Sequence, residues 1–199
     1  HAFIAYQNHL GIHWSAATRT LDIDFAHPGR NISIAMPSGL TIDTRGAIES
    51  LQMGFVPNLA QTTYTKTDEP DLQLDFVTTR VAANDRPIHL PDLQVTLQPL
   101  KFMEYSLEDT LQGVLLSRRG PLVVNLPQPQ RYALHKLIVH GERSGDLRTK
   151  AVKDLDQSAC LLAWFLDHEP ESLHDAWSDL RSRGKGWLSR LTVGAAALD

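Results

Sequence analysis

The sequence predicts an α+β protein, in which a mixed β-sheet core is followed by a helical C-terminal lobe. Residues 19–127 contain several short stretches where apolar and polar residues alternate, which is the period of half-buried strands. Residues 130–198 repeat apolar residues every three to four positions, which is the period of amphipathic helices. The pattern changes near Pro129, and we predict a core domain at residues 1–126 and a helical lobe at residues 127–199.

The predicted core begins with a short helix. Apolar residues stand at near-helical spacing up to Leu10, and Gly11 follows as a stop signal. The stretch RTLDIDFA, residues 19–26, alternates and predicts a strand, whereas RGAIESLQMG, residues 45–54, predicts a helix closed by Gly54. Further strands are predicted at residues 61–66, 71–80, 92–100, 110–117 and 121–127.

The helical lobe begins with QRYALHKLIVHG, residues 130–141, where Gly141 is predicted to be the C-cap. A longer helix is predicted over residues 146–168. Its apolar stripe is predicted to contain Leu155, Ala159, Leu162 and Leu166. Two more helices, at residues 171–183 and 186–198, complete the lobe.

The overall composition is that of a soluble globular protein, with 42% hydrophobic and 21% charged residues in 199. The apolar runs are shorter than the roughly 20 residues of a membrane-spanning helix, so we expect no membrane partner. The single cysteine, Cys160, forms no internal disulfide and suits a reducing compartment. The chain starts at His1 without a secretory signal, and we expect a trimmed piece of a bacterial cytoplasmic protein.

Charge is unevenly distributed along the chain. The formal net charge of −4 argues against a surface that binds polyanions everywhere. Residues 131–153 nevertheless contain six Lys or Arg and two Asp or Glu, whereas residues 68–109 contain nine acidic and three basic residues. An acidic and a basic segment are suited to act together on a metal-bound phosphate. Two differently solvated faces are the alternative.

Aspartates occupy unusual places in two predicted strands. Asp22 and Asp24 are two residues apart and therefore share one face of a strand, where aspartate is otherwise disfavoured. Asp75, in LQLDFV, has the same apolar neighbours. If the two strands are neighbours with matching faces, three carboxylates converge, and their hard oxygen donors suit Mg²⁺ or Mn²⁺. The alternative is a solvated sheet face that binds nothing.

These stretches resemble a known family. TRTLDIDFA and LQLDFV resemble the paired and third aspartates of the DNA polymerase beta type nucleotidyltransferase superfamily. A bacterial group with the nucleotidyltransferase fold is also similar, through the block PQPQRYALHKLIVHGERSGDLRTKAVKDLDQSACLL. The resemblance covers residues 1–166 and implies that the sheet is a nucleotidyltransferase core. It implies that Asp22 and Asp24 bind the catalytic metals and that Asp75 binds metal or deprotonates the acceptor.

The resemblance also gives the basic segment a role. On the long helix, one polar face contains residues at positions i, i+3, i+4 and i+7, namely Lys150, Lys153, Asp154 and Gln157. The preceding helix adds Arg131, His135 and Lys136. By the resemblance, Lys136, Lys150, Lys153 and Asp154 contact the nucleotide. With Arg131 and His135 of the preceding helix, they would form a basic wall that faces the phosphates. A solvated helix face is the alternative.

The leading functional hypothesis is a metal-dependent nucleotidyltransferase. It would transfer NMP from an NTP such as ATP to a hydroxyl group. The acceptor would be RNA, including tRNA, a protein or a small molecule. A toxin-like role is a narrower version of this enzyme hypothesis. The Gly-Ser or Gly-Thr turn of the superfamily would precede His1 and is not in this sequence. The competing hypothesis is therefore a non-catalytic nucleotide- or protein-binding module. No phosphate-binding P-loop, G-x-S-x-G motif or dinucleotide fingerprint is present.

Overall fold

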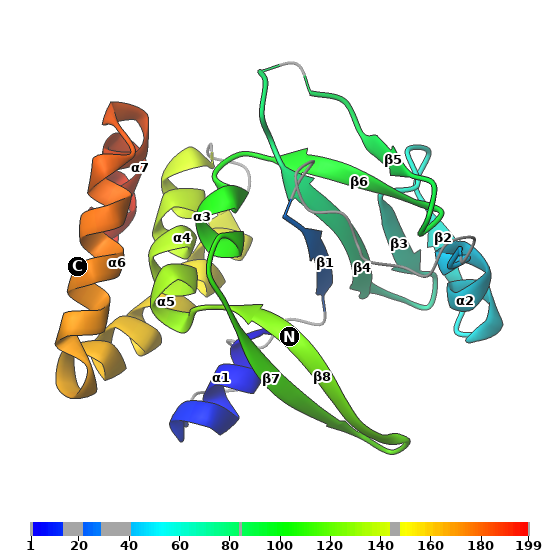
Figure 1. The fold of residues 1–199 in the computed structure, drawn as a ribbon, viewed down its shortest axis with the longest axis horizontal. Coiled ribbons are helices and arrows are strands. Elements are labelled where there is room, and N and C mark those ends of the chain that lie inside the picture. Colours follow the sequence, from blue (N-terminus) through cyan, green and yellow to red (C-terminus); the bar gives the residue numbers. More distant parts are fainter. Residues whose placement is uncertain (1, 14–21, 29–40, 84, 144–147, 199) are drawn as a thin grey trace. The chain divides into compact units, whose positions relative to one another are not determined.

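The computed structural model describes residues 2–13, 22–28, 41–83, 85–143 and 148–198, except for the side chains of residues 148–150 (Figure 1). Its mixed sheet and C-terminal helices confirm the predicted α+β fold class. The chain forms two compact units. The sheet unit contains the described residues of the range 20–104, and the helical unit contains the described residues of the ranges 2–19 and 105–199.

The two units do not follow the predicted division at residue 126. The first helix and the hairpin of residues 110–127 both belong to the helical unit. The reason is hydrophobic packing, because Leu126 of the hairpin shares one buried cluster with Phe3 and Tyr6. The Tyr6 hydroxyl also donates a 2.7 Å hydrogen bond to the Pro127 carbonyl.

The sheet unit is built around one long central strand. Its strands are β1 (Ile23–His27), β2 (Phe55–Pro57), β3 (Thr63–Lys66), β4 (Glu69–Thr79), β5 (Ile88–Leu90) and β6 (Val95–Leu100). Five strands lie in the order β2-β3-β4-β6-β5, and β1 also pairs with β4. Strand β4 is parallel to β1 and β6 and antiparallel to β3. The short strands β2 and β5 were not predicted, since three residues are too few to show a period.

One face of this sheet is covered by helix α2 (Thr44–Ser50). Ile48 of α2 packs in a buried cluster with Leu74 and Phe76 of β4. The helix begins at the N-cap Asp43, whose side chain accepts a hydrogen bond from the backbone N–H of Gly46. It ends four residues earlier than predicted. Burial of this apolar face leaves the alternate residues of β4 on the opposite face.

The helical unit contains the hairpin and the helices that follow it. Its elements are α1 (Ala2–Leu10), α3 (Met103–Leu107, whose first two residues are in the sheet unit), β7 (Thr110–Ser117), β8 (Gly120–Pro127), α4 (Pro129–Glu142), α5 (Arg148–His168), α6 (Pro170–Ser182) and α7 (Lys185–Ala196). Helix α1 ends before Gly11, which has a φ of 67°. No helix in the described ranges is long and apolar enough to cross a membrane.

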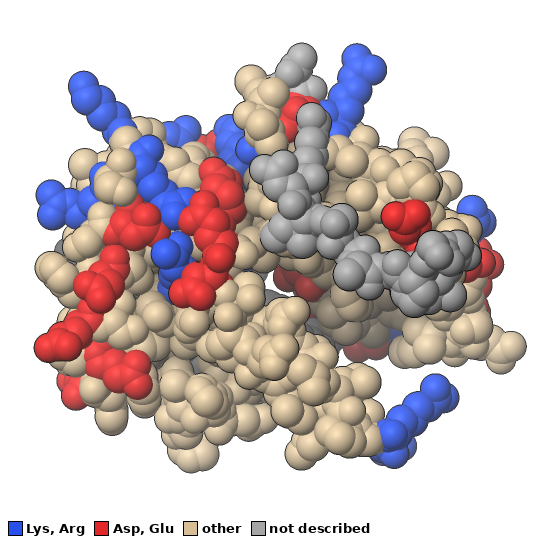
Figure 2. All heavy atoms as spheres, in the orientation of Figure 1, with Lys and Arg blue, Asp and Glu red and all other residues tan. Residues whose placement is uncertain are grey.

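Tyr105 lies between two arginines in the interior of the helical unit. The ring centroid is 4.8 Å from the Arg131 guanidinium carbon and 5.0 Å from that of Arg183. Asp179 forms ion pairs with both arginines, because its Oδ2 lies 2.8 Å from Arg131 Nη2 and 2.9 Å from Arg183 Nη2. Glu108 also pairs with Arg183. Figure 2 shows acidic and basic side chains lying next to one another on the molecular surface.

Gly141 is a packing residue and not the predicted C-cap. Helix α4 continues to Glu142, and Gly141 lies inside its last turn. A Cβ atom added at Gly141 would collide with the carbonyl of Arg190 on α7. A Cβ atom added at Gly194 of α7 would likewise collide with the carbonyl of Leu137 on α4. Two glycines therefore allow the backbones of α4 and α7 to approach closely.

We predict that Gly141→Ala destabilises the protein by about 2 kcal/mol, because the added methyl group must separate two helix backbones. Helix propensity alone predicts the opposite sign, a gain of about 1 kcal/mol. The matched control is Gly186→Ala in the first turn of α7, where the nearest atom to an added Cβ is the end of Arg190 at 3.7 Å. Urea unfolding of both variants measures the effect. A Gly141→Ala protein as stable as the Gly186→Ala control would contradict this packing role.

The buried stripe of α5 differs from the predicted one by one position. The residues that face the interior are Ala151, Asp154, Ser158, Leu161 and Phe165, together with Gln157. In the predicted stripe, Ala159 is exposed and Leu166 is 64% exposed. The prediction was wrong because it excluded polar residues from the interior, whereas here these residues have hydrogen-bonding partners on α4.

Candidate functional site

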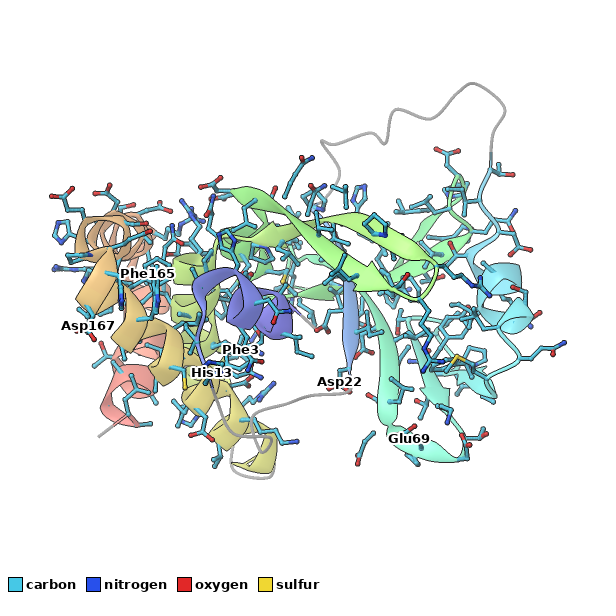
Figure 3. All side chains as sticks on the ribbon, turned by 90° about the horizontal axis from the view of Figure 1, so that it is seen from below. Phe3, His13, Asp22, Glu69, Phe165 and Asp167 are labelled. Atoms are coloured by element: carbon cyan, nitrogen blue, oxygen red, sulfur yellow. The ribbon has the colours of Figure 1, made fainter. Side chains whose placement is uncertain are left out.

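Two aspartates lie side by side on neighbouring strands of the sheet unit. Strand β1 pairs with β4 in parallel, in a register that sets Asp24 opposite Asp75. Paired residues of adjacent strands project from the same face, and their backbones are about 4.8 Å apart. Asp22 lies directly before β1 and two residues before Asp24, and Figure 3 labels it at this end of the strand. The strand pairing that the metal-site hypothesis required is therefore present.

The apolar core determines which face these aspartates occupy. Ile23 pairs with Leu74, and Phe25 stacks on Phe76 with ring centroids 5.2 Å apart. Leu74 and Phe76 belong to the buried cluster under α2. Ile23 packs against the same cluster. A shift of β1 by one residue would turn Asp24 toward the cluster and Ile23 away from it, so burial of Ile23 holds the register.

Thr63 of β3 orients one of the carboxylates. Thr63 is the residue opposite Asp75 in the antiparallel pair β3–β4, and its hydroxyl donates a 2.6 Å hydrogen bond to Asp75 Oδ1. Asp75 is partly buried, whereas Asp24 is exposed. Sequence reasoning missed Thr63. Its position in an alternating strand gives no indication of which residue on another strand faces it.

The donor set of this acidic face fits a hard divalent cation. Asp22, Asp24 and Asp75 offer only carboxylate oxygens, which Mg²⁺ and Mn²⁺ prefer over nitrogen and sulfur ligands. Within the described residues, no three His, Cys, Asp or Glu side chains already form a metal-binding cluster. Mg²⁺ is usually held by one or two carboxylates together with substrate phosphates and water, so a complete protein cage is not required.

In the helical unit, two residues of the predicted nucleotide-binding set form an ion pair with each other. Lys136 Nζ of α4 lies 2.7 Å from Asp154 Oδ1 of α5 and 5.1 Å from the ring centroid of Tyr132. Asp154 also pairs through Oδ2 with Arg143. Asp154 is only 5% exposed, so its negative charge holds both cations in place at the α4–α5 contact.

Hydrogen bonds continue this contact along the two helices. The Tyr132 hydroxyl donates to Gln157 Oε1 at 3.1 Å, and the Ser158 hydroxyl donates to the Ala133 carbonyl at 2.9 Å. Gln157 and Ser158 are buried. The polar face expected on this helix thus lies partly in the interior and joins α5 to α4.

Arg131 and His135, the other residues of the predicted nucleotide-binding set on α4, differ in charge and in hydrogen-bonding partners. Arg131 is held by Asp179 and by the carbonyl of Tyr105. His135 is buried, and its Nε2 has no hydrogen-bonding partner within the described part of the chain. Burial, and next the charge of Lys136, lower the pKa of His135 to about 3, so this imidazole is neutral at pH 7.

Two lysines of the same set lie in the first turns of α5. Lys153 is partly buried and makes no ion pair with any described residue. The side chain of Lys150 lies outside the described residues. Lys153 and Lys136 are therefore the lysines of this segment whose side chains the structure describes, and both are partly exposed. Arg131 and Arg143 are also partly exposed and, like Lys136, each is paired with a carboxylate.

Comparison with known proteins identifies the family. A family model described as Nucleotidyltransferase matches residues 1–182, which is most of the chain and includes both the acidic face and the α4–α5 contact. No curated protein and no solved structure matches. The family implies an NTP substrate and nucleotidyl transfer in general. The chain belongs to the nucleotidyltransferase family.

Proposed function

We propose that this protein is a metal-dependent nucleotidyltransferase of the DNA polymerase beta type, which transfers NMP from an NTP such as ATP to a hydroxyl group. The observation that carries the proposal is the parallel register of β1 and β4, which sets Asp24 opposite Asp75. Family membership supports nucleotidyl transfer. The acceptor would be RNA such as tRNA, a protein or a small molecule in a bacterial cytoplasm, and the single cysteine supports such a reducing setting.

In this proposal, Asp22, Asp24 and Asp75 hold Mg²⁺ or Mn²⁺. When bound, the ion would activate the attacking hydroxyl group and neutralise the negative charge of the leaving pyrophosphate. Asp75 is also the candidate for receiving the acceptor proton. Thr63 holds its Oδ1, so we assign Oδ2 to the metal or to the proton. A carboxylate fixed in this way needs little reorganisation when charge develops in the transition state.

We further propose that Lys136 and Lys153 of the helical unit contact the nucleotide phosphates. A lysine ammonium is a compact point charge with three donors, which suits phosphate oxygens that move during transfer. Asp154 would act as a positioning residue for Lys136, because their ion pair restricts the lysine to one conformation. His135 supplies no positive charge in this scheme.

The proposal is tested by incubating the full-length protein with each α-labelled NTP, with Mg²⁺ or Mn²⁺, and with cell extract. We expect one or more NTPs to label a macromolecule or small molecule, and EDTA to abolish the label. The identity of the labelled fraction then distinguishes RNA, protein and small-molecule acceptors. Nucleotide binding without any transfer would instead support the non-catalytic binding module.

We predict that Thr63→Val lowers the transfer rate about tenfold and raises the Mg²⁺ concentration needed for half-maximal rate, because outer partners orient metal ligands. Thr63→Ser keeps the hydroxyl and should restore both values. Thr65→Val, two residues along the same face of β3, is the matched control. Equal Mg²⁺ dependence in Thr63→Val and Thr65→Val would exclude this orienting role.

A further inference from the structure

Helix α5 has a second row of apolar residues beside the row that packs inside the helical unit. This outer stripe consists of Val152, Leu155, Ala159, Leu162 and Leu166. Val152 is 56% exposed and Leu166 is 64% exposed, and Ala159 between them is also exposed. Leu155 and Leu162 are half-buried at the edge of the interior. The described part of the helical unit therefore leaves most of the stripe uncovered.

The spacing of the outer stripe is that of a helix–helix contact. Its members follow one another at intervals of three, four, three and four residues, which is the heptad pattern of helices that pack along their length. A helix that packs on one neighbour needs an apolar stripe only about 100° wide. The buried and outer stripes together cover about twice that arc, at 100° per residue. Helix α5 thus has an apolar surface for a second helix.

The outer stripe is complementary to itself. Val152 and Leu166 are each seven residues from Ala159, on opposite sides of it. A twofold axis through Ala159 would place Val152 against Leu166 of a second, antiparallel copy and would bring the two Ala159 side chains together. A small residue at the centre permits close approach, and a twofold interface requires such a self-complementary patch.

The charges at the two ends of α5 favour the antiparallel arrangement. Residues 148–153, at the start of α5, contain three basic and no acidic residues. Residues 167–171, which run from the last turn of α5 into the first turn of α6, contain three acidic residues and no Lys or Arg. Basic residues are disfavoured at the N-terminal end of a helix, where the helix dipole is positive. Antiparallel pairing sets the acidic end of one copy, which includes Asp167 (Figure 3), beside the basic end of the other. Parallel pairing sets like charges together.

We infer that the protein forms a homodimer in which α5 packs antiparallel against α5 of a second copy, through the outer stripe. This interface is independent of the proposed transfer reaction. The outer stripe supplies five residues from each copy, fewer than the roughly 20–30 of a standard interface, so the dimer should dissociate at low protein concentration.

Sedimentation of the full chain over a wide concentration range tests the dimer. We expect the mass to rise from monomer to dimer, and we expect Leu166→Asp and Val152→Asp each to leave only monomer. The controls place the same change on other exposed apolar residues, Val193→Asp on α7 and Leu116→Asp on β7, and should still dimerise. Circular dichroism confirms that each variant is folded. A monomer at all concentrations, or a dimer lost only in Leu116→Asp, would refute the inference.

Cysteine cross-linking tests the direction of pairing. In a Cys160→Ser background, Ala159→Cys should form a disulfide-linked dimer on mild oxidation, and the background protein should not. In the antiparallel pair, two copies of position 166 would be about 21 Å apart, from the rise of 1.5 Å per residue. Leu166→Cys should therefore not cross-link to itself. More efficient cross-linking at position 166 than at position 159 would overturn the antiparallel arrangement.

Discussion

Asp24→Asn is expected to reduce nucleotidyl transfer about a thousandfold, a loss of roughly 4 kcal/mol in transition-state stabilisation. Asparagine has almost the same shape as aspartate but lacks the charge that would hold a divalent cation. Asp24 is exposed on the face opposite the apolar cluster, so the substitution should leave the sheet intact. The initial rate of label transfer from the preferred NTP, at several Mg²⁺ concentrations, is the measurement.

Stability gives a second readout of the same substitution. Asp24 and Asp75 are paired in register, and like charges in adjacent positions repel one another. Removing one charge should therefore keep or slightly raise the free energy of unfolding while activity is lost, which is the expected trade-off at a functional site.

The matched control is Asp71→Asn, an exposed aspartate on the same strand as Asp75 and about 13 Å further along it. It should retain transfer. Asp75→Asn should behave like Asp24→Asn. If Asp24→Asn transferred as fast as Asp71→Asn, the aspartates would be a solvated face and the metal-site proposal would fail.

Asp154→Ala is expected to destabilise the helical unit by about 3–5 kcal/mol, because it leaves Lys136 and Arg143 without their shared buried partner. The cost arises from uncompensated charge at the α4–α5 contact. Urea unfolding followed by circular dichroism measures it. Asp156→Ala, two residues along the same helix and exposed, should change stability by less than about 0.5 kcal/mol.

A double variant separates the ion pair from simple loss of packing. Lys136→Met with Asp154→Leu replaces both partners by apolar side chains, which often restores stability in buried pairs. Arg143 is the less buried cation, with a quarter of its side chain exposed, and it can turn to solvent. We therefore expect the double variant to be more stable than Asp154→Ala but inactive if Lys136 contacts phosphate. Equal stability of Asp154→Ala and Asp156→Ala would contradict the structural role of Asp154.

The local patterns of this sequence were sufficient to predict individual elements and the face of a strand. The hairpin of residues 110–127 and the end of α1 before Gly11 are where turn and alternation signals placed them. The side chains of Asp75 and Leu74 point to opposite faces of the sheet, because successive residues of a strand alternate. These features depend on neighbours in the chain, and hydrophobic period and glycine conformation report them directly.

Tertiary structure alone decided which residues meet. The hydrogen bond between Thr63 and Asp75 depends on the register of two strands, and nothing in either strand specifies the partner residue. Gly141 has the sequence position of a helix stop, yet α7 packs so closely that a glycine is needed within the helix.

The α4–α5 contact shows the same distinction most clearly. By sequence, Asp154 and Gln157 form a polar face beside an apolar stripe, and polarity alone indicates solvent. In the structure they are buried, because Lys136 and Tyr132 of α4 satisfy their charge and hydrogen bonds. The sequence by itself determined the α+β class, the longer strands and helices, and the alternation that separates Asp24 and Asp75 from their apolar neighbours. The partners across strands and helices, and therefore which polar residues lie inside, were decided only by the tertiary structure, since burial of a polar group depends on a partner that is distant in sequence.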